Sequence, residues 1–327
     1  LRFDVINLIS KPDVYEDDLE GDGHRFYTDG PKIHQYLQEL NENTFGKYDD
    51  VVTVGEMSST TLENSIRYSN PESNELSMIF SFHHLKVDYP SGNKWEIEPF
   101  RFHDLKKHLF TWQEEMEKGG GWNALFWCNH DQPRIVSRIG NEKEYRVKSA
   151  KCLATAIHGL KGTPYIYQGE EIGMTNAGYT SIDEYMDIES LNYYNILKLQ
   201  GKSEEEVIRI LGAKSRDNSR TPMQWDASEN AGFTKGTPWL KVCDRYKEIN
   251  TESRHEPDSV FQYYKELVKL RKELPVIQKG SVTPLLREDK EILAYKREYQ
   301  GKELYVFCNF FDGEVEVPYS IPEDCRS

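Results

Sequence analysis

Short apolar runs alternate with helical patterns along most of the chain. The runs are rich in β-branched and aromatic residues, and we expect them to form strands at residues 3–6, 51–54, 78–82, 124–127 and 165–167. Continuous apolar runs of this kind are typical of parallel strands that are covered by helices on both faces. The pattern therefore predicts an α/β fold with a parallel sheet.

Helical periodicity fills the segments between these runs. The sequence Asp29-Gly30-Pro31 predicts a capped helix start, because Pro is favoured in the first turn of a helix. Apolar residues then recur every three to four positions, as expected for one buried helix face. Similar patterns predict further helices at residues 147–157 and 261–274.

Two parallel architectures fit this alternation. One is a (β/α)₈ TIM barrel, which uses roughly 30 residues per strand–helix unit, and the other is a doubly wound sheet. The pattern changes after residue 275, where polar turns join strands expected at residues 282–286, 292–298 and 303–307. We therefore predict two domains, an α/β domain at 1–275 and a small antiparallel β-domain at 276–327.

Charge and composition exclude several classes of partner. The net charge is −14, which opposes binding to nucleic acid. No apolar run approaches the roughly 20 residues of a membrane span, so we expect no membrane partner. The five cysteines are odd in number and never spaced as C-x-x-C. This spacing predicts neither a zinc site nor a disulfide framework, and it favours a reducing cytoplasm.

Three acidic residues stand where a predicted strand ends. They are Asp4, Glu56 and Asp131, and the ends of parallel strands converge on the crevice where active sites lie. Paired carboxylates in a sugar-sized cleft perform glycoside hydrolysis. A metal site that uses His130 and Asp131 is the alternative, but no other His or Cys falls in a regular ligand spacing.

Several segments resemble a known family. Residues 2–7, 54–57 and 129–134 resemble the second, third and fourth conserved regions of the α-amylase superfamily. Residues 162–171 and 216–225 are similar to segments of its oligo-1,6-glucosidase branch. The resemblance implies that residues 1–275 are the second half of a catalytic (β/α)₈ barrel, strands 4 to 8. It also implies that residues 276–327 are part of a carboxyl-terminal β-sandwich domain, truncated here.

The resemblance also implies a retaining mechanism. Asp4 would be the nucleophile, Glu56 the general acid/base and Asp131 the carboxylate that stabilises the distorted sugar. Arg2 lies two residues before Asp4 on one strand face, where a guanidinium keeps a carboxylate ionised. Retention requires Asp4 and Glu56 to stand roughly 5–5.5 Å apart.

Two further residues are similar to residues of the family that bind the sugar in the subsite where cleavage occurs. They are His130 and Arg216. The alternative for Arg216 is a surface ion pair with its neighbour Asp217.

Within the branch, residues 21–31, 57–61 and 80–89 resemble the trehalose-6-phosphate hydrolases. A phosphorylated disaccharide requires cations at the rim of the cleft. The candidates are Lys86, His83, His84 and Arg25, each of which could instead be a solvated surface group. The expected reaction is hydrolysis of trehalose 6-phosphate to glucose and glucose 6-phosphate.

Two other functions stay open. An oligo-1,6-glucosidase or another exo-acting α-glucosidase would share the three carboxylates without needing the basic rim. A non-catalytic, transporter-associated member would act as a binding or assembly protein, and the intact carboxylates count against it.

The family's first barrel strands and its metal-binding loop have no counterpart in the sequence. We therefore expect both ends of the enzyme to be missing and the 327-residue piece alone to be unstable or inactive. No cofactor is assigned, because any calcium or magnesium loop lies outside the chain. The expected partner is a small sugar phosphate, which does not cross membranes passively and again points to the cytoplasm. The sequence predicts no oligomeric state.

Overall fold

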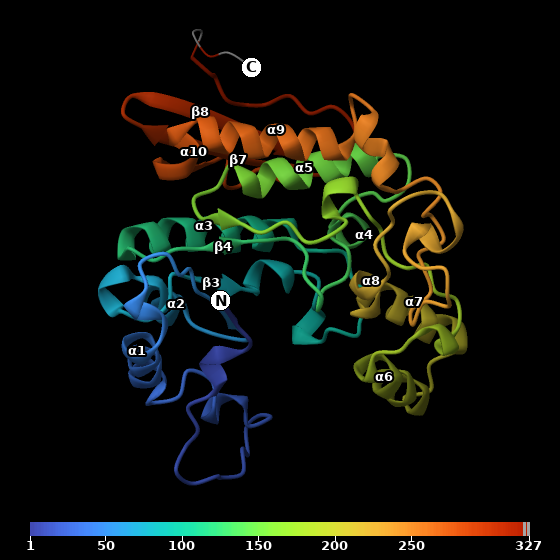
Figure 1. Cartoon of the computed structure of the whole chain (residues 1–327), viewed down its shortest axis with the longest axis horizontal. Helices are drawn as coiled ribbons and strands as arrows, with labels where there is room; N and C mark the ends of the chain where they lie inside the picture. The colour runs from blue at the N-terminus through green and yellow to red at the C-terminus, as the bar shows by residue number, and fades with distance from the viewer. Residues whose placement is uncertain (323–324, 326–327) are drawn as a thin grey trace.

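The computed structural model describes residues 1–322 and 325. Within them, five short parallel strands follow one another in chain order: β1 (Arg2–Phe3), β2 (Val54–Met57), β3 (Met78–Ser81), β4 (Ala124–Leu125) and β5 (Thr163–Pro164). A parallel bridge between Ile79 and Asn123 connects β3 to β4. Strictly consecutive strands are the order of a (β/α)₈ barrel, whereas a doubly wound sheet reverses its order at a switch point. The predicted half-barrel is therefore confirmed (Figure 1).

The strand boundaries differ from the predicted runs. Residues 51–53 lie before β2, and the run at 165–167 lies after β5. The chain also leaves β1 early, because Val5 has a left-handed φ of 36° and Ile6–Leu8 form a 3₁₀ turn. An apolar run shows which residues are buried, and the buried residues extend beyond those that form strand hydrogen bonds. Trp127, for example, is fully buried although it lies outside β4.

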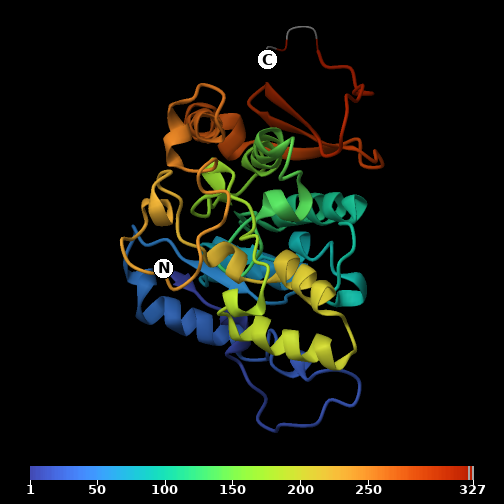
Figure 2. The ribbon, with the colours of Figure 1, turned by 90° about the vertical axis from the view of Figure 1, so that its right-hand side faces the viewer.

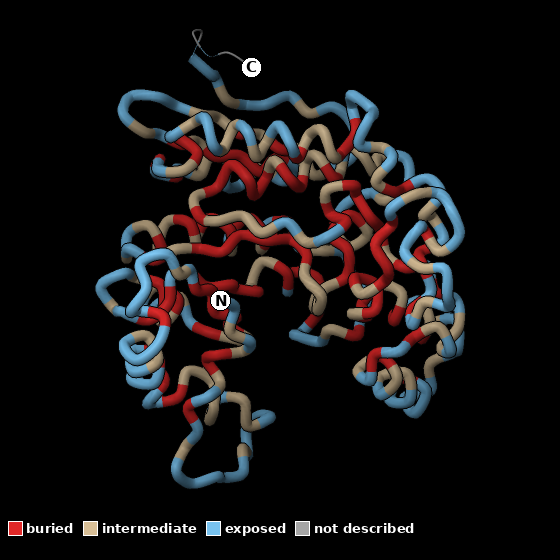
Figure 3. Tube along the Cα trace, viewed as in Figure 1, coloured by how far each residue is buried: buried red, intermediate tan, exposed pale blue. Residues whose placement is uncertain are grey.

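Helices lie between and around the strands, as predicted: α1 (Ile33–Asn43), α2 (Leu62–Ser69), α3 (Phe102–Gly119), α4 (Ile135–Ile139), α5 (Arg146–His158), α6 (Ile188–Leu199), α7 (Glu204–Lys214), α8 (Asp217–Arg220), α9 (Val260–Glu273) and α10 (Pro275–Lys279). Figure 3 shows the buried segments running through the centre of the molecule, with exposed outer turns. One prediction was wrong in detail, because α1 begins at Ile33 and Asp29 does not cap it. In the described part of the chain, no helix is both long and apolar enough to cross a membrane.

The carboxyl-terminal strands form an antiparallel sheet, as predicted: β6 (Ser281–Leu285), β7 (Ile292–Tyr299) and β8 (Lys302–Asn309). The sheet packs on α5 in one continuous hydrophobic cluster that includes Leu153, Tyr295 and Val306 (Figure 2). The hydroxyl of Tyr295 donates a hydrogen bond of 3.1 Å to the carbonyl of Ala156 in α5. The sheet and α5 therefore share one core. The domain division at residue 275 stays a prediction.

One buried acid should make stability depend on pH. Glu170, in the loop after β5, accepts a hydrogen bond of 2.9 Å from the hydroxyl of Tyr264 in α9. Burial raises the pKa of Glu170 to about 7 despite this bond. The folded protein therefore retains a proton that the unfolded chain releases near pH 4.5.

We expect the free energy of unfolding to fall by about 3 kcal/mol as the pH rises from about 4.5 to about 7, through Glu170 alone. Urea denaturation of wild type and Glu170→Gln across this range measures the effect. The variant lacks this fall, so its free energy of unfolding should decrease less, or increase more, than that of the wild type as the pH rises, and an equal slope in both proteins would contradict the assignment.

Candidate active site

Two neighbouring strands bring an arginine and two carboxylates together. Arg2 lies in β1 with Asp4 directly after it, and Glu56 lies in β2, which pairs with β1 in parallel. Arg2 Nη1 donates to Asp4 Oδ1 at 3.0 Å, and Arg2 Nη2 forms an ion pair with Glu56 Oε2. Arg2 and Asp4 therefore share one face, as the two-residue period of a strand predicts.

The two carboxyl groups have opposite environments. The Glu56 side chain is 6% exposed and the Asp4 side chain 70% exposed. Burial, reinforced by a hydrogen bond to Asp4, raises the pKa of Glu56 to about 7. The same bond from Glu56, together with Arg2, lowers the pKa of Asp4. Below about pH 7 the site therefore favours one ionised carboxylate, Asp4, beside one protonated carboxyl, Glu56, the pairing that glycoside hydrolysis uses.

The third carboxylate lies close to this pair. Asp131 follows β4, and its charge contributes to the raised pKa of Glu56. His130 in turn contributes to the lowered pKa of Asp4, and its Nε2 lies 3.3 Å from Asp131 Oδ2. The structure therefore brings the three predicted carboxylates and His130 to one end of the strands.

Arg216 belongs to an ion-pair network around Asp131. Its guanidinium makes two bonds of 2.7 Å to Asp187, and its Nη1 lies 3.4 Å from Asp131 Oδ1. The alternative pairing with Asp217 is wrong, because Asp217 Oδ2 accepts hydrogen bonds from the backbone of Met186 and Asp187. Arg216 therefore faces the site.

Four members of this network were missed in the sequence. Arg220 Nη2 contacts Asp131 Oδ1 at 2.6 Å, and Asp187 holds Arg216. Glu189 bridges Arg216 at 3.1 Å to Lys94 at 2.7 Å. The sequence could have indicated Arg220, because it stands four residues after Arg216, one helical turn further along α8, and so lies on the same helix face. Asp187 resembles an ordinary helix cap, and it does cap α6.

The two histidines predicted to bind phosphate have a different environment. His84 Nε2 donates a hydrogen bond of 2.8 Å to the carbonyl of Phe126. The His83 ring packs at a tilt against Trp112, with 4.4 Å between the ring centroids. Burial lowers the pKa of both imidazoles to about 4. They are therefore neutral near pH 7, and the prediction that they supply positive charge is not supported.

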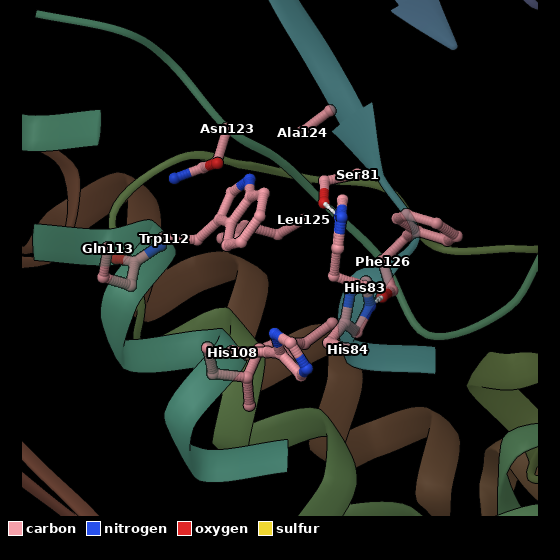
Figure 4. A pocket seen from close by; sticks show the side chains of 12 residues that line it. Ser81, His83, His84, His108, Trp112, Gln113, Asn123, Ala124, Leu125 and Phe126 are labelled. Carbon is pink, nitrogen blue, oxygen red and sulfur yellow. Dashed lines mark hydrogen bonds between the residues drawn. The ribbon is translucent and has the colours of Figure 1, made fainter. Parts of the chain in front are cut away.

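These histidines line a small pocket between β3, β4 and α3. Figure 4 shows His83, His84, His108 and Trp112 around it. The pocket has a volume of about 40 Å³, which holds one or two water molecules and is too small for a sugar phosphate. The pocket is therefore not the phosphate site.

The other two cations differ from each other. Arg25 is neutralised in its own loop, with ion pairs of 2.8 Å to Asp18 and 3.0 Å to Glu20. Lys86 follows β3 at the same strand ends as Glu56, and its side chain is exposed. Partial desolvation of the ammonium lowers the pKa of Lys86, although the residue as a whole is exposed. Among the described residues, no carboxylate forms an ion pair with it. Lys86 is thus the better placed candidate for an anion.

A metal centre has no support in the described part of the chain. Within residues 1–322 and 325, no three His, Cys, Asp or Glu side chains form a group that could hold a metal ion. Asp131 instead forms ion pairs with Arg216 and Arg220, and the His130 ring contacts Asp131 itself.

Comparison with known proteins gives the context for this site. The chain is 54% identical over 323 residues to the trehalose-6-phosphate hydrolase of Bacillus subtilis, covering 98% of the chain and 57% of that relative. It is 49% identical over 317 residues to an oligo-1,6-glucosidase of Halalkalibacterium halodurans, covering 95% of the chain and 56% of that relative. The chain therefore spans little more than half the length of these relatives.

Solved structures agree. The crystal structure of trehalose-6-phosphate hydrolase from Bacillus licheniformis matches with a TM-score of 0.93 and 60% identity, covering 99% of this chain and 58% of that one. The family model for the α-amylase catalytic domain matches residues 1–280. The chain belongs to the α-amylase family.

Proposed function

We propose that the whole protein is a retaining α-glucosidase that hydrolyses trehalose 6-phosphate to glucose and glucose 6-phosphate. The observation that carries the proposal is the pair Asp4 and Glu56, both in contact with Arg2 at one end of the strands of an α-amylase-family domain, with the pKa lowered for exposed Asp4 and raised to about 7 for buried Glu56. The chain is about 57% of the length of its relative from B. subtilis, so the activity is assigned to the complete protein.

The proposed roles follow from charge and protonation. Asp4 attacks the anomeric carbon while Glu56 gives its proton to the leaving glycosidic oxygen, so that a covalent glycosyl-enzyme forms. Glu56, now ionised, then takes a proton from water, and the hydroxide equivalent displaces Asp4 from the sugar. Arg2 contacts both side chains and stabilises whichever carboxylate is charged. The expected separation of roughly 5–5.5 Å between the two carboxyl groups stays a prediction.

Asp131 is proposed to stabilise the positive charge that develops on the sugar. Arg216 and Arg220 hold it from one side and His130 from the other, which fixes its position before substrate binds. Burial alone would raise the pKa of Asp187, but its bonds to Arg216 lower the pKa below the ordinary value. Asp187 therefore stays ionised and orients Arg216, which with His130 would donate hydrogen bonds to the sugar hydroxyls.

Lys86 is proposed to bind the phosphate. It lies on the loop after β3, and the same loop carries Lys94, which reaches the Arg216 network through Glu189. The loop therefore borders the sugar site. A partly desolvated ammonium with no described counter-ion gains a strong charge-assisted contact when a phosphate arrives. Because a sugar phosphate does not cross membranes passively, the proposed substrate favours a cytoplasmic location.

The test compares trehalose 6-phosphate with trehalose in the complete protein. We expect Lys86→Ala to lower kcat/KM for trehalose 6-phosphate roughly 10- to 100-fold, the value of one hydrogen bond to a charged group. Hydrolysis of 4-nitrophenyl α-glucoside, which carries no phosphate, should change little and shows that the catalytic site is intact. Lys86→Arg should retain most of the preference. Equal loss on all three substrates would contradict a phosphate role.

A second candidate, an oligo-1,6-glucosidase, is favoured by the 49% identity to the H. halodurans relative. It would use the same three carboxylates and cleave isomaltose. If wild-type protein cleaves isomaltose with a higher kcat/KM than trehalose 6-phosphate, this second function replaces the first.

A further inference from the structure

A polar cluster joins the chain segments that follow Asp4 and Glu56. Its centre is Asp29, whose carboxylate accepts four hydrogen bonds: from Asn7 Nδ2 at 3.0 Å, Thr60 Oγ1 at 2.8 Å, Asn64 Nδ2 at 3.0 Å and the Tyr68 hydroxyl at 2.7 Å. All four donors are neutral. Asn7 and Tyr68 are fully buried, so the carboxylate is held by side chains with little access to water.

Asn7 completes the cluster. Its Nδ2 also donates to the carbonyl of Ser59 at 2.7 Å, and its Oδ1 accepts from the backbone of Ser58 at 3.2 Å. Its carbonyl accepts from the backbone of Asp29 at 3.0 Å. Asn7 therefore contacts both the segment after β2 and the loop that leads to α1.

The cluster joins the two segments that carry the reacting groups. Asn7 is three residues after Asp4, and Ser58 is two residues after Glu56. The strands themselves are short, since β1 has two residues and β2 has four, so the ladder alone fixes little of the geometry beyond Phe3. Side-chain bonds must supply the remaining constraint.

Asp29 suits this position for two reasons. Its φ is 49°, in the left-handed region that Asp tolerates better than most residues. A carboxylate offers about four lone-pair sites and no donor, which matches four donors. An amide in its place would present its own N–H₂ to donors and leave buried groups unpaired.

We propose that Asp29 and Asn7 are positioning residues that hold the segments of Asp4 and Glu56 in a fixed relative position, in which Arg2 contacts both carboxyl groups. Neither touches substrate in this proposal, which rests on the proposed function for its catalytic consequence. Two of the segments that resemble the trehalose-6-phosphate hydrolases, 21–31 and 57–61, are thus joined by the hydrogen bond from Thr60 to the Asp29 carboxylate.

The first measurement does not depend on substrate. The titration of Glu56 is followed by ¹³C NMR of labelled Glu side chains in the complete protein, with the signal assigned by its loss in Glu56→Gln. In Asp29→Asn the pKa of Glu56 should fall by about one unit, because a loosened loop admits water to Glu56 and weakens the influence of Asp4 on it. Thr60→Val, which removes a single donor, should cause a smaller shift in the same direction.

Glu75→Gln is the matched control. Glu75 accepts a hydrogen bond of 2.9 Å from His34 and is buried, but it precedes β3 at the opposite end of the strands. The Glu75→Gln substitution should lower the Tm without changing the pKa of Glu56. The proposal is overturned if Asp29→Asn and Thr60→Val leave the Glu56 titration where Glu75→Gln leaves it.

Kinetics then separates the two claims. We expect Asp29→Asn to lower kcat for trehalose 6-phosphate roughly 10- to 100-fold with little change in KM, because misplaced groups cost rate more than binding. The alkaline limb of the pH profile should move down with the Glu56 titration. If wild type cleaves no glucoside while the titration still shifts in Asp29→Asn, the proposed function fails and the positioning role stands.

Discussion

Replacing Asp4 with Asn should lower kcat/KM for trehalose 6-phosphate by roughly 10⁴- to 10⁶-fold, the loss seen when a covalent nucleophile is removed. The physical reason is that an amide cannot form the glycosyl-enzyme, while the surrounding charges remain. Steady-state kinetics of the complete protein measures the loss. Asp13→Asn is the matched control, because its side chain is 90% exposed in the segment after β1, and it should retain wild-type activity.

A product test distinguishes a nucleophile from a merely supporting carboxylate. In Asp4→Ala, azide should enter the space of the lost side chain and attack the α-glucoside once. One displacement inverts the anomeric centre, so the expected product is the β-glucosyl azide. Recovery of the α-glucosyl azide, or an activity of Asp4→Asn within tenfold of wild type, on the order of 1.4 kcal/mol, would contradict the role.

Replacing Glu56 with Gln should have the second largest effect. General acid catalysis contributes roughly 10²- to 10⁴-fold, and this loss is expected on trehalose 6-phosphate, whose leaving group is a sugar alkoxide. The loss should be much smaller for 4-nitrophenyl α-glucoside, because nitrophenolate leaves without a proton. The leaving-group comparison therefore separates acid catalysis from general damage.

The pH profile gives an independent reading of Glu56. Activity requires Glu56 protonated and Asp4 ionised, so kcat/KM should fall as the pH rises through about 7 and rise as the pH increases through the lowered pKa of Asp4. Glu56→Gln should remove the alkaline limb. Glu72→Gln, an exposed residue, should keep it. A limb that persists in Glu56→Gln belongs to another group and would refute the assignment.

The sequence predicted the chain order of the elements better than their ends. Apolar runs overlapped four of the five parallel strands, and the fifth run begins directly after β5. The predicted carboxyl-terminal strands matched the observed antiparallel strands to within one or two residues at each end. The early end of β1 could not be predicted, because the left-handed turn at Val5 contradicts the preference of a β-branched residue. It arises from tertiary contacts of Ile6 and Asn7, which are both buried.

The sequence predicted those site residues whose reactive side chain stands at or near the end of an apolar strand. Asp4, Glu56 and Asp131 each follow or end an apolar strand, so local pattern sufficed. Asp187 and Glu189 could not be found this way. They belong to the site only because they contact Arg216, which is distant from them in the sequence. The charges of His83 and His84 were misjudged for a related reason, since burial against α3 cannot be read from a histidine pair.

The role of Asp29 also could not be predicted from its local sequence. Its sequence context favours a helix cap, a local role, whereas the structure uses its carboxylate to join segments that lie 22 to 39 residues away. Local propensity and tertiary demand compete at such positions, and tertiary hydrogen bonds prevail where the donors are buried.

The most direct measurement is ¹H NMR of trehalose 6-phosphate during the first minutes of reaction with the complete protein. The account predicts that glucose and glucose 6-phosphate appear in equal amounts and that the glycosyl residue transferred to water appears first as its α anomer, before mutarotation. First appearance of the β anomer, or no cleavage of trehalose 6-phosphate by a protein that cleaves other α-glucosides, would contradict it.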